Sequence, residues 1–198
     1  NSISIITQRL AMEFEPKEDA DNYSRLLRTI REEIKRLNKI IEQFLSFARK
    51  PKVKLNIENL SDILSKTVEL ISAEADHKNI RINKQIENSI TANIDSDQMQ
   101  QVFINILKNS LQAVEETGTI TVTLRKLSNE ILIEVADTGR GIAKENLSKI
   151  FNLYYSTKPD GTGIGLSIVN QIISEHNGRI EVDSEPGKGT KVRISLKS

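Results

Sequence analysis

Apolar side chains in the first quarter of the chain recur every three or four residues, as they do on one face of an α-helix. Residues 1–15 show this spacing, and it resumes from Tyr23 after Pro16 and a polar run at 17–22. The second stretch is an a/d heptad seam, which is typical of helices that pair along their length. Its members are Leu27, Ile30, Ile34, Leu37, Ile41, Phe44 and Ala48.

The apolar stripe of this second helix is wider than one partner requires, because Leu26, Ile40 and Phe47 lie beside the seam. We therefore predict a helical hairpin over residues 1–49 that pairs with a second copy into a dimeric four-helix bundle. The alternative is an ordinary helix packed on its own domain. Pro51 is expected to stop the helix, with a linker at 50–54.

From residue 55 onward, helical and strand periods are interleaved. Neighbouring strands joined by short turns must pair antiparallel, so we predict a mixed five-stranded sheet with helices on one face. The chain is thus expected to be α+β, with an α/β sandwich at 55–198. Helices are predicted over 58–75, 96–115, 144–150 and 164–176, and strands over 80–86, 90–94, 119–127, 131–137, 179–184 and 190–196.

The amino-acid composition argues against several classes of function. The 198 residues are enough for one medium domain and a small one. The 28 Lys and Arg nearly balance the 27 Asp and Glu, and no basic patch stands out, so nucleic-acid binding has no support. The chain has no cysteine, which excludes disulfides and thiolate metal sites. No apolar run reaches the ~20 residues of a membrane helix, so any membrane anchor is expected outside this chain.

An asparagine pair marks the predicted helix at 96–115. Asn105 and Asn109 are four residues apart and share a face, while Val102, Ile106 and Leu107 would pack elsewhere. A carboxamide oxygen is a possible ligand of Mg²⁺, which prefers oxygen donors. Helix capping or hydrogen bonding inside the core would explain the pair equally well.

The segment "DTGRGI" (137–142) stands where a predicted strand ends. Asp137 could accept a hydrogen bond from the amino group of a base, and Gly139 and Gly141 would let the backbone approach a flat ring. A tight turn is the alternative interpretation, because Asp and Gly are common in turns.

A second glycine-rich segment, "DGTGIGLS" (160–167), leads into a predicted helix. This arrangement suits a polyphosphate, because the N–H groups at a helix start point at the anion. It is not a dinucleotide fingerprint, which would need a glycine where Leu166 stands. "GKGT" (187–190) imitates part of a P-loop but is interpreted as a turn between two strands.

Between these segments lies "IFNLYYSTK" (150–158). Phe151, Tyr154 and Tyr155 could pack a lid, and Lys158 could reach a phosphate. Aromatic residues at this spacing are, however, more usually part of a core.

Taken in order, the asparagine helix, Asp-x-Gly-x-Gly, aromatic segment and Gly-x-Gly-x-Gly resemble the Bergerat ATPase fold shared by histidine kinases, Hsp90, gyrase and MutL. "STKPDGTGIGLSIV" and the tail "IISEHNGRIEVDSEPGKGTKVRISL" resemble the histidine kinases in particular. The resemblance covers the whole chain. One departure is Asn152 and Leu153, where many relatives carry an acidic residue and a proline, and it concerns the lid rather than the fold.

The resemblance implies roles for individual residues. Asn109 would bind Mg²⁺, with Asn105 and Lys108 supporting catalysis. Asp137 would bind the adenine amino group above Gly139 and Gly141. The implied ATP-binding residues are Asn109, Asp137, Gly139, Gly141, Ile142, Tyr155, Lys158, Gly161, Thr162, Gly163, Ile164, Gly165 and Leu166.

The function implied is that of a cytoplasmic, homodimeric sensor histidine kinase core. It would transfer the γ-phosphoryl of Mg²⁺–ATP to a histidine of the helical domain, and then to an aspartate on a response-regulator receiver domain. Only two histidines are present: His77, expected in an exposed turn, and His176, expected to cap a helix C-terminus. Neither fits the acceptor, so we expect the acceptor upstream of Asn1 and no autophosphorylation of this chain.

Two other functions stay open. One is a non-catalytic, nucleotide-sensing dimeric regulator. The other is a chaperone- or topoisomerase-like ATPase, although those enzymes usually carry a glutamate base where Asn105 stands.

Overall fold

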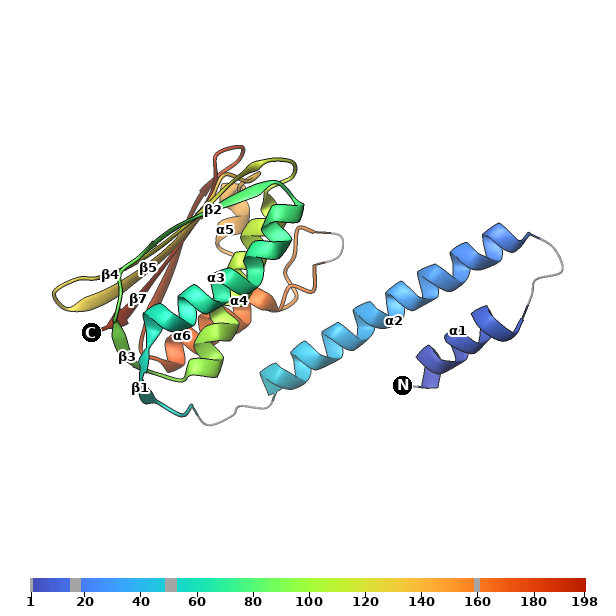
Figure 1. Ribbon diagram of the computed structural model, residues 1–198, viewed down its shortest axis with the longest axis horizontal. Coiled ribbons are helices and arrows are strands. Elements are labelled where there is room, and N and C mark those ends of the chain that lie inside the picture. The colour runs from blue at the N-terminus through green and yellow to red at the C-terminus, as the bar shows by residue number, and fades with distance from the viewer. Residues whose placement is uncertain (1, 15–18, 49–52, 159–160) are drawn as a thin grey trace. The chain divides into compact units, whose positions relative to one another are not determined.

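The computed structural model describes residues 2–14, 19–48, 53–158 and 161–198. They form two compact units, one mainly within residues 1–50 and the other mainly within residues 51–198. We call these the helical unit and the α/β unit (Figure 1). The predicted helix stop at Pro51 lies outside the described residues, as do most of the predicted linker, Pro16 and Asp160.

The helical unit contains α1 (Ser2–Glu13) and α2 (Ala20–Ala48). α2 begins three residues before the predicted start at Tyr23. The side chain of Asp19 accounts for this, because its Oδ1 accepts the N–H of Asn22 at 3.1 Å and so caps the first turn.

The two helices pack antiparallel. Tyr23 Oη donates to the carbonyl oxygen of Leu10 at 2.8 Å, and Arg31 Nη2 donates to that of Thr7 at 3.4 Å. Moving forward along α2 therefore moves backward along α1. Thr7 is itself buried in this contact.

α1 covers only one edge of the apolar stripe on α2. Leu27 and Ile34 are buried, whereas Leu37 is 55% exposed. The predicted seam therefore has a covered edge and an open edge; the side chains of Phe44 and Ala48 lie outside the described set. The other large apolar side chains described as exposed in this unit are Ile5, Ile6, Met12, Phe14, Leu26, Ile30 and Ile41.

The α/β unit is built on a five-stranded sheet of order β2-β4-β5-β7-β6. β2 pairs with β4 in parallel, and the other neighbours are antiparallel, so the predicted mixed sheet is confirmed. The strands are β2 (Ile80–Ile86), β4 (Gly118–Lys126), β5 (Glu130–Asp137), β6 (Arg179–Glu185) and β7 (Gly189–Lys197).

A second, two-stranded sheet was not predicted. β1 (Asn56–Asn59) pairs antiparallel with β3 (Thr91–Ile94), so the strand predicted at 90–94 forms but does not join the main sheet. β1 is hard to detect in the sequence because it has four residues and one apolar side chain, Ile57, which is exposed.

Helices cover one face of the main sheet (Figure 1). They are α3 (Leu60–His77), α4 (Ser96–Ala113), α5 (Lys144–Leu147) and α6 (Gly165–Glu175). The helix predicted at 144–150 is shorter, with four residues. Asn59 and Asp95 are the N-caps of α3 and α4, and their side chains accept the N–H of Asp62 and Gln98.

The core lies between the sheet and these helices. The alternation of side chains along β5 places one polar residue, Asp137, on the side that faces this core. Alternate residues Ile131, Ile133 and Val135 are buried, and the next residue on the same face is Asp137. The inward-facing series of the strand thus ends on a carboxylate. Phe103, Met99, Leu107 and Leu111 of α4 and Leu60 and Leu64 of α3 are among the fully buried side chains in this core.

Candidate functional site

Asp137 is the buried carboxylate of the candidate site, with 7% of its surface exposed. Its Oδ1 accepts two backbone N–H groups, from Gly139 at 3.0 Å and from Thr190 at 3.1 Å. No donor among the described residues bonds to Oδ2. The two bonds fix the direction of the carboxylate, which presents Oδ2 as an acceptor.

The loop after β5 is fixed to two neighbouring segments. Arg140 donates its N–H to the carbonyl oxygen of Ala113 at 3.0 Å, and its own carbonyl accepts the N–H of Gly187 at 2.8 Å. The N–H of Ile142 donates to Ser184 Oγ at 2.9 Å. The loop is therefore held between the C-terminal end of α4 and the turn that joins β6 to β7.

The two glycines of this loop are required by close packing. A Cβ on Gly139 would come within 2.6 Å of the carbonyl group of Ala113. Gly141 has a positive φ of 71°, and a Cβ there would collide with the carbonyl oxygen of Glu185. Both glycines therefore bring the loop backbone against its neighbours, which a side chain would prevent.

α4 carries the predicted polar residues Asn105, Lys108 and Asn109. Asn105 is half-buried, and its Nδ2 donates to the carbonyl oxygen of Gln101 at 3.0 Å. Its Oδ1 lies 3.2 Å from the place that a Cβ on Gly165 would occupy. Asn109 is half-buried and Lys108 is exposed. Asn105 thus presents an oxygen to the first residue of α6.

The glycine-rich loop before α6 packs on the aromatic segment. Gly163 has a φ of 67°, and a Cβ there would collide with the backbone of Tyr154 and Tyr155. α6 starts after Ile164, whose buried apolar side chain makes no capping hydrogen bond. The predicted residues Gly161, Thr162, Gly165 and Leu166 are half-buried along this path.

The aromatic segment is only partly packed. Tyr155 is half-buried and its Oη donates to Oδ1 of Asn146, in α5, at 2.6 Å. Tyr154 is 60% exposed and has a φ of 65°, an uncommon value for a residue with a side chain. Phe151 and Lys158 are half-buried.

The geometry therefore joins the predicted residues through α4. Its last residue, Ala113, contacts the loop after Asp137, and Asn105, eight residues earlier, contacts the start of α6. Eight residues of α-helix span about 12 Å. The loop after Asp137 and the start of α6 thus both lie against α4, with Asn109 between the two places in the sequence of the helix.

A family model described as "Histidine kinase-, DNA gyrase B-, and HSP90-like ATPase" matches residues 94–198, which is more than half of the chain. The chain belongs to this ATPase family. The matched range begins at the end of β3 and includes α4, the Asp137 loop and the glycine-rich loop.

Curated relatives and solved structures agree with this membership. The sensor histidine kinase ZraS of Salmonella typhi is 34% identical over 173 residues, which are 86% of this chain and 37% of that protein. The catalytic domain of histidine kinase ThkA has a TM-score of 0.67 at 27% identity, over 73% of this chain and 95% of that one. The chain spans 24–40% of the length of the curated relatives it matches.

Two structures of longer kinases also match. ShkA, solved at full length with AMPPNP, has a TM-score of 0.74 at 25% identity, over 95% of this chain and 41% of that one. ThkA in complex with the response regulator protein TrrA has a TM-score of 0.75 at 23% identity, over 99% of this chain and 56% of that one, and shows the shared fold.

Sequence reasoning missed two members of the site in this ATPase-family chain. "GKGT" (187–190) connects two strands, as predicted, but its last two residues already belong to β7, and Thr190 also holds the carboxylate of Asp137. Ser184 binds the loop at Ile142. The only signal was the neighbouring pattern "SEPGKGT", which gives no indication of contacts to residues more than forty positions away.

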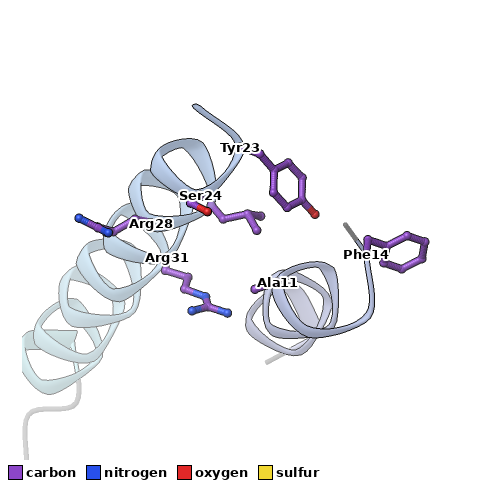
Figure 2. Close-up of a pocket in the computed structure, with 7 residues that line it drawn as sticks. Ala11, Phe14, Tyr23, Ser24, Arg28 and Arg31 are labelled. Atoms are coloured by element: carbon purple, nitrogen blue, oxygen red, sulfur yellow. The ribbon is translucent and has the colours of Figure 1, made fainter. Parts of the chain in front are cut away.

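The helical unit has a hollow of its own, of ≈ 350 Å³. Figure 2 shows the Tyr23 ring and the Arg31 guanidinium extending from α2 toward α1. Ala11, Phe14, Ser24, Leu27 and Arg28 complete its lining. Within the described ranges, no helix has the length and apolar character needed to cross a membrane.

Proposed function

We propose that this chain is the kinase core of a sensor histidine kinase. It binds Mg²⁺–ATP and transfers the γ-phosphoryl to a histidine of the dimeric helical domain, from which it passes to an aspartate of a response-regulator receiver domain. The observation that carries this proposal is the position of two segments along α4. The loop that follows the carboxylate of Asp137 bonds to the last residue of α4, and the start of α6, which has no side-chain cap, lies beside Asn105 of the same helix.

The carboxylate end fits an adenine base. Oδ2 of Asp137 can only accept a hydrogen bond, so it favours a base with an exposed amino group. Gly139 and Gly141 hold the loop backbone close to Ala113 and Glu185, so that the loop next to Oδ2 keeps one fixed path. A flat base would lie against this loop.

The other end fits phosphate groups. The residues 161–166 bring backbone N–H groups to the start of α6, where the helix dipole favours an anion. Ile164 provides no competing side-chain cap. Lys108 and Lys158 would add positive charge, and Tyr155 would support the loop through its contact with Gly163.

Asn109 and Asn105 fit the remaining roles. Carboxamide oxygens match the preference of Mg²⁺ for oxygen ligands, so Asn109 would hold the ion. The bond from Asn105 Nδ2 to Gln101 leaves its Oδ1 directed at Gly165, where it would position the phosphate loop. A carboxamide does not deprotonate water, and this favours phosphoryl transfer over the hydrolysis expected of a chaperone-like ATPase.

When bound, ATP would supply the phosphoryl group, and Mg²⁺ would neutralise the negative charge that develops during its transfer. The chain's own contribution is positioning. The Asp137 loop fixes the base, the residues before α6 fix the phosphates, and the aromatic segment shields them from water. The cytoplasm is the compartment proposed for this core, since ATP is its substrate.

The helical unit fits a homodimer. Among the side chains that the structure describes in this unit, eight large apolar ones are exposed, including Ile30, Leu37 and Ile41 on α2. A second copy would cover them in a four-helix bundle. The response regulator is proposed as a partner because ThkA, which shares the fold, was solved with one.

Calorimetry with ADP and Mg²⁺ tests the proposed nucleotide site. Asp137→Asn should weaken ADP binding by about 1–3 kcal/mol, because it replaces an acceptor oxygen by a donor or an uncharged acceptor. Asp183→Asn is the matched control, since Asp183 is exposed on β6. Unchanged affinity in Asp137→Asn would exclude the proposed base contact.

A further inference from the structure

Ser184 has an unusual set of contacts for a hydroxyl near the end of an edge strand. Its Oγ donates to the carbonyl oxygen of Gly189 at 2.8 Å and accepts the N–H of Ile142 at 2.9 Å. It also lies 2.9 Å from Oγ1 of Thr190. A serine hydroxyl has one hydrogen, so with that hydrogen on Gly189 the threonine hydroxyl is the donor in the third contact.

These three bonds join two segments that build the base end of the site. Ile142 follows Asp137 in the loop, and Thr190, the second residue of β7, donates its own N–H to Asp137 Oδ1. Ser184 and Thr190 are direct partners in the register of β6 and β7. The hydroxyl therefore fixes the position of the residue that orients the carboxylate.

The rest of the framework is backbone. Gly187 bonds to Arg140, and Gly141 lies against Glu185. No substitution removes those contacts without changing the path of the chain. Ser184 is the side chain through which the junction can be altered while the backbone and its glycines stay in place.

We propose that Ser184 is a positioning residue for base recognition: its hydroxyl locks the β6–β7 turn to the Asp137 loop, so that Oδ2 of Asp137 points at the amino group of adenine. The inference rests on the proposed function, since it assigns the selectivity of the same nucleotide site. It predicts that losing the hydroxyl reduces the preference for adenine more than it reduces nucleotide binding in general.

Ser184→Thr and Ser184→Val form the matched pair, because threonine and valine have nearly the same shape and only threonine keeps the hydroxyl. The affinities of ADP and IDP, each with Mg²⁺, are measured by calorimetry on the whole chain. IDP carries an oxygen in place of the 6-amino group, so it reports binding without the amino contact. Ser128→Ala, in the exposed turn between β4 and β5, is the control for serine loss elsewhere.

Ser184→Val should bind ADP about 10-fold more weakly, the effect of losing roughly one net hydrogen bond. Its affinity for IDP should stay close to that of the wild type, so that the ADP/IDP ratio falls by about the same factor. Ser184→Thr and Ser128→Ala should keep the wild-type ratio. Ser184→Ala, which cannot crowd the turn, should repeat the valine result.

The possible outcomes distinguish a failure of the positioning role of Ser184 from a failure of the proposed nucleotide site. Wild-type affinity for ADP in both hydroxyl-free variants overturns the positioning role, as does an equal loss of ADP and IDP, which would indicate general loosening. A wild-type chain that binds neither nucleotide would overturn the proposed function, and this inference with it.

Discussion

Asp95 donates its backbone N–H to Nε2 of His176 at 2.9 Å, across 81 positions of sequence. Nδ1 of the same ring lies 2.8 Å from the carbonyl oxygen of Ile172. Since Nε2 accepts, Nδ1 must carry the hydrogen and donate it, which defines a neutral tautomer. The ring thereby links the C-terminal cap of α6 to the N-terminal cap of α4.

His176→Ala should therefore destabilise the α/β unit by about 1–3 kcal/mol, because the N–H of Asp95 loses its acceptor at a part-buried position. His77→Ala is the control, since His77 is the exposed last residue of α3. It should stay within about 0.5 kcal/mol of the wild type. Urea unfolding of the two variants, compared at pH 7, measures the difference, and equal stabilities would contradict the structural role of His176.

The buried side-chain amide of Gln98, beside this contact, provides a second test of the role of His176. In a capping box, the side chain of Gln98 would accept the N–H of Asp95. His176 takes that N–H, and Oε1 of Gln98 is buried without a hydrogen-bond partner. Gln98→Ala should therefore cost little in the wild type. It should cost more in the His176→Ala background, where Oε1 is the acceptor that remains.

The carboxylate of Asp95 gives a pH dependence of known sign. Burial raises its pKa, but the backbone N–H groups of Lys54, Gln98 and Asp97 outweigh this, and the net pKa is lowered. A pKa that is lower in the folded state means that the unfolded state binds more protons on acidification. The stability contribution is therefore complete above the unfolded pKa and is lost as the pH falls through the folded value.

Asp95→Asn should accordingly be less stable than the wild type at pH 7, and this difference should shrink as the pH falls below about 4. Asp76→Asn, which removes an exposed carboxylate near the end of α3, should show no such convergence. Urea unfolding at a series of pH values measures both variants. A difference that is constant with pH would assign the effect to lost hydrogen-bond geometry instead of charge.

Contacts that follow from local pattern were predictable. The alternation of β5 places Asp137 at its buried end, and the four-residue spacing places Asn105 and Asn109 on one face of α4. Each of these conclusions needs only the period of one element. The short β1 escaped detection because four residues give no period to recognise.

Contacts between distant segments were not predictable in the same way. The bond from Thr190 to Asp137 depends on the pairing of β5 with β7, and the bond from Asp95 to His176 depends on the packing of α6 beside α4. Asp and Thr are also common in turns, so their residue types carry no signal of a partner. His176 was expected as a helix cap, and it is one, but its second contact was invisible.

The exposed apolar edge of α2 gives the test of the dimer. Ile30 and Leu37 are seven residues apart on the open edge, whereas Ile34 is already buried within the unit. Ile30→Glu with Leu37→Glu should put charges into the proposed interface and yield monomers in sedimentation experiments. Arg25→Glu with Glu32→Lys has the same spacing at exposed positions on another side of α2 and should leave the dimer intact. Dimers of the first variant would exclude this edge as the interface.

The last prediction concerns the phosphoacceptor. Both nitrogens of His176 are engaged and the residue is 7% exposed, so it offers no nucleophile to ATP. His77 is exposed, but it ends a helix of the α/β unit instead of lying on α1 or α2. We therefore expect no labelling when the chain is incubated with Mg²⁺ and labelled ATP, although it binds nucleotide.

Adding the native upstream sequence should restore labelling, and the label should be acid-labile, as a phosphoramidate is. The nucleophile must be a neutral imidazole, so labelling should require a histidine on the extended α1. His77→Ala in the longer chain should leave the label intact, which distinguishes the proposed acceptor from the exposed histidine already present. Labelling of His77 or His176 in the present chain would overturn this account, because phosphoryl transfer would then occur within the α/β unit. An upstream segment without histidine would favour the nucleotide-sensing regulator, since the ATP site would have no acceptor in its own dimer.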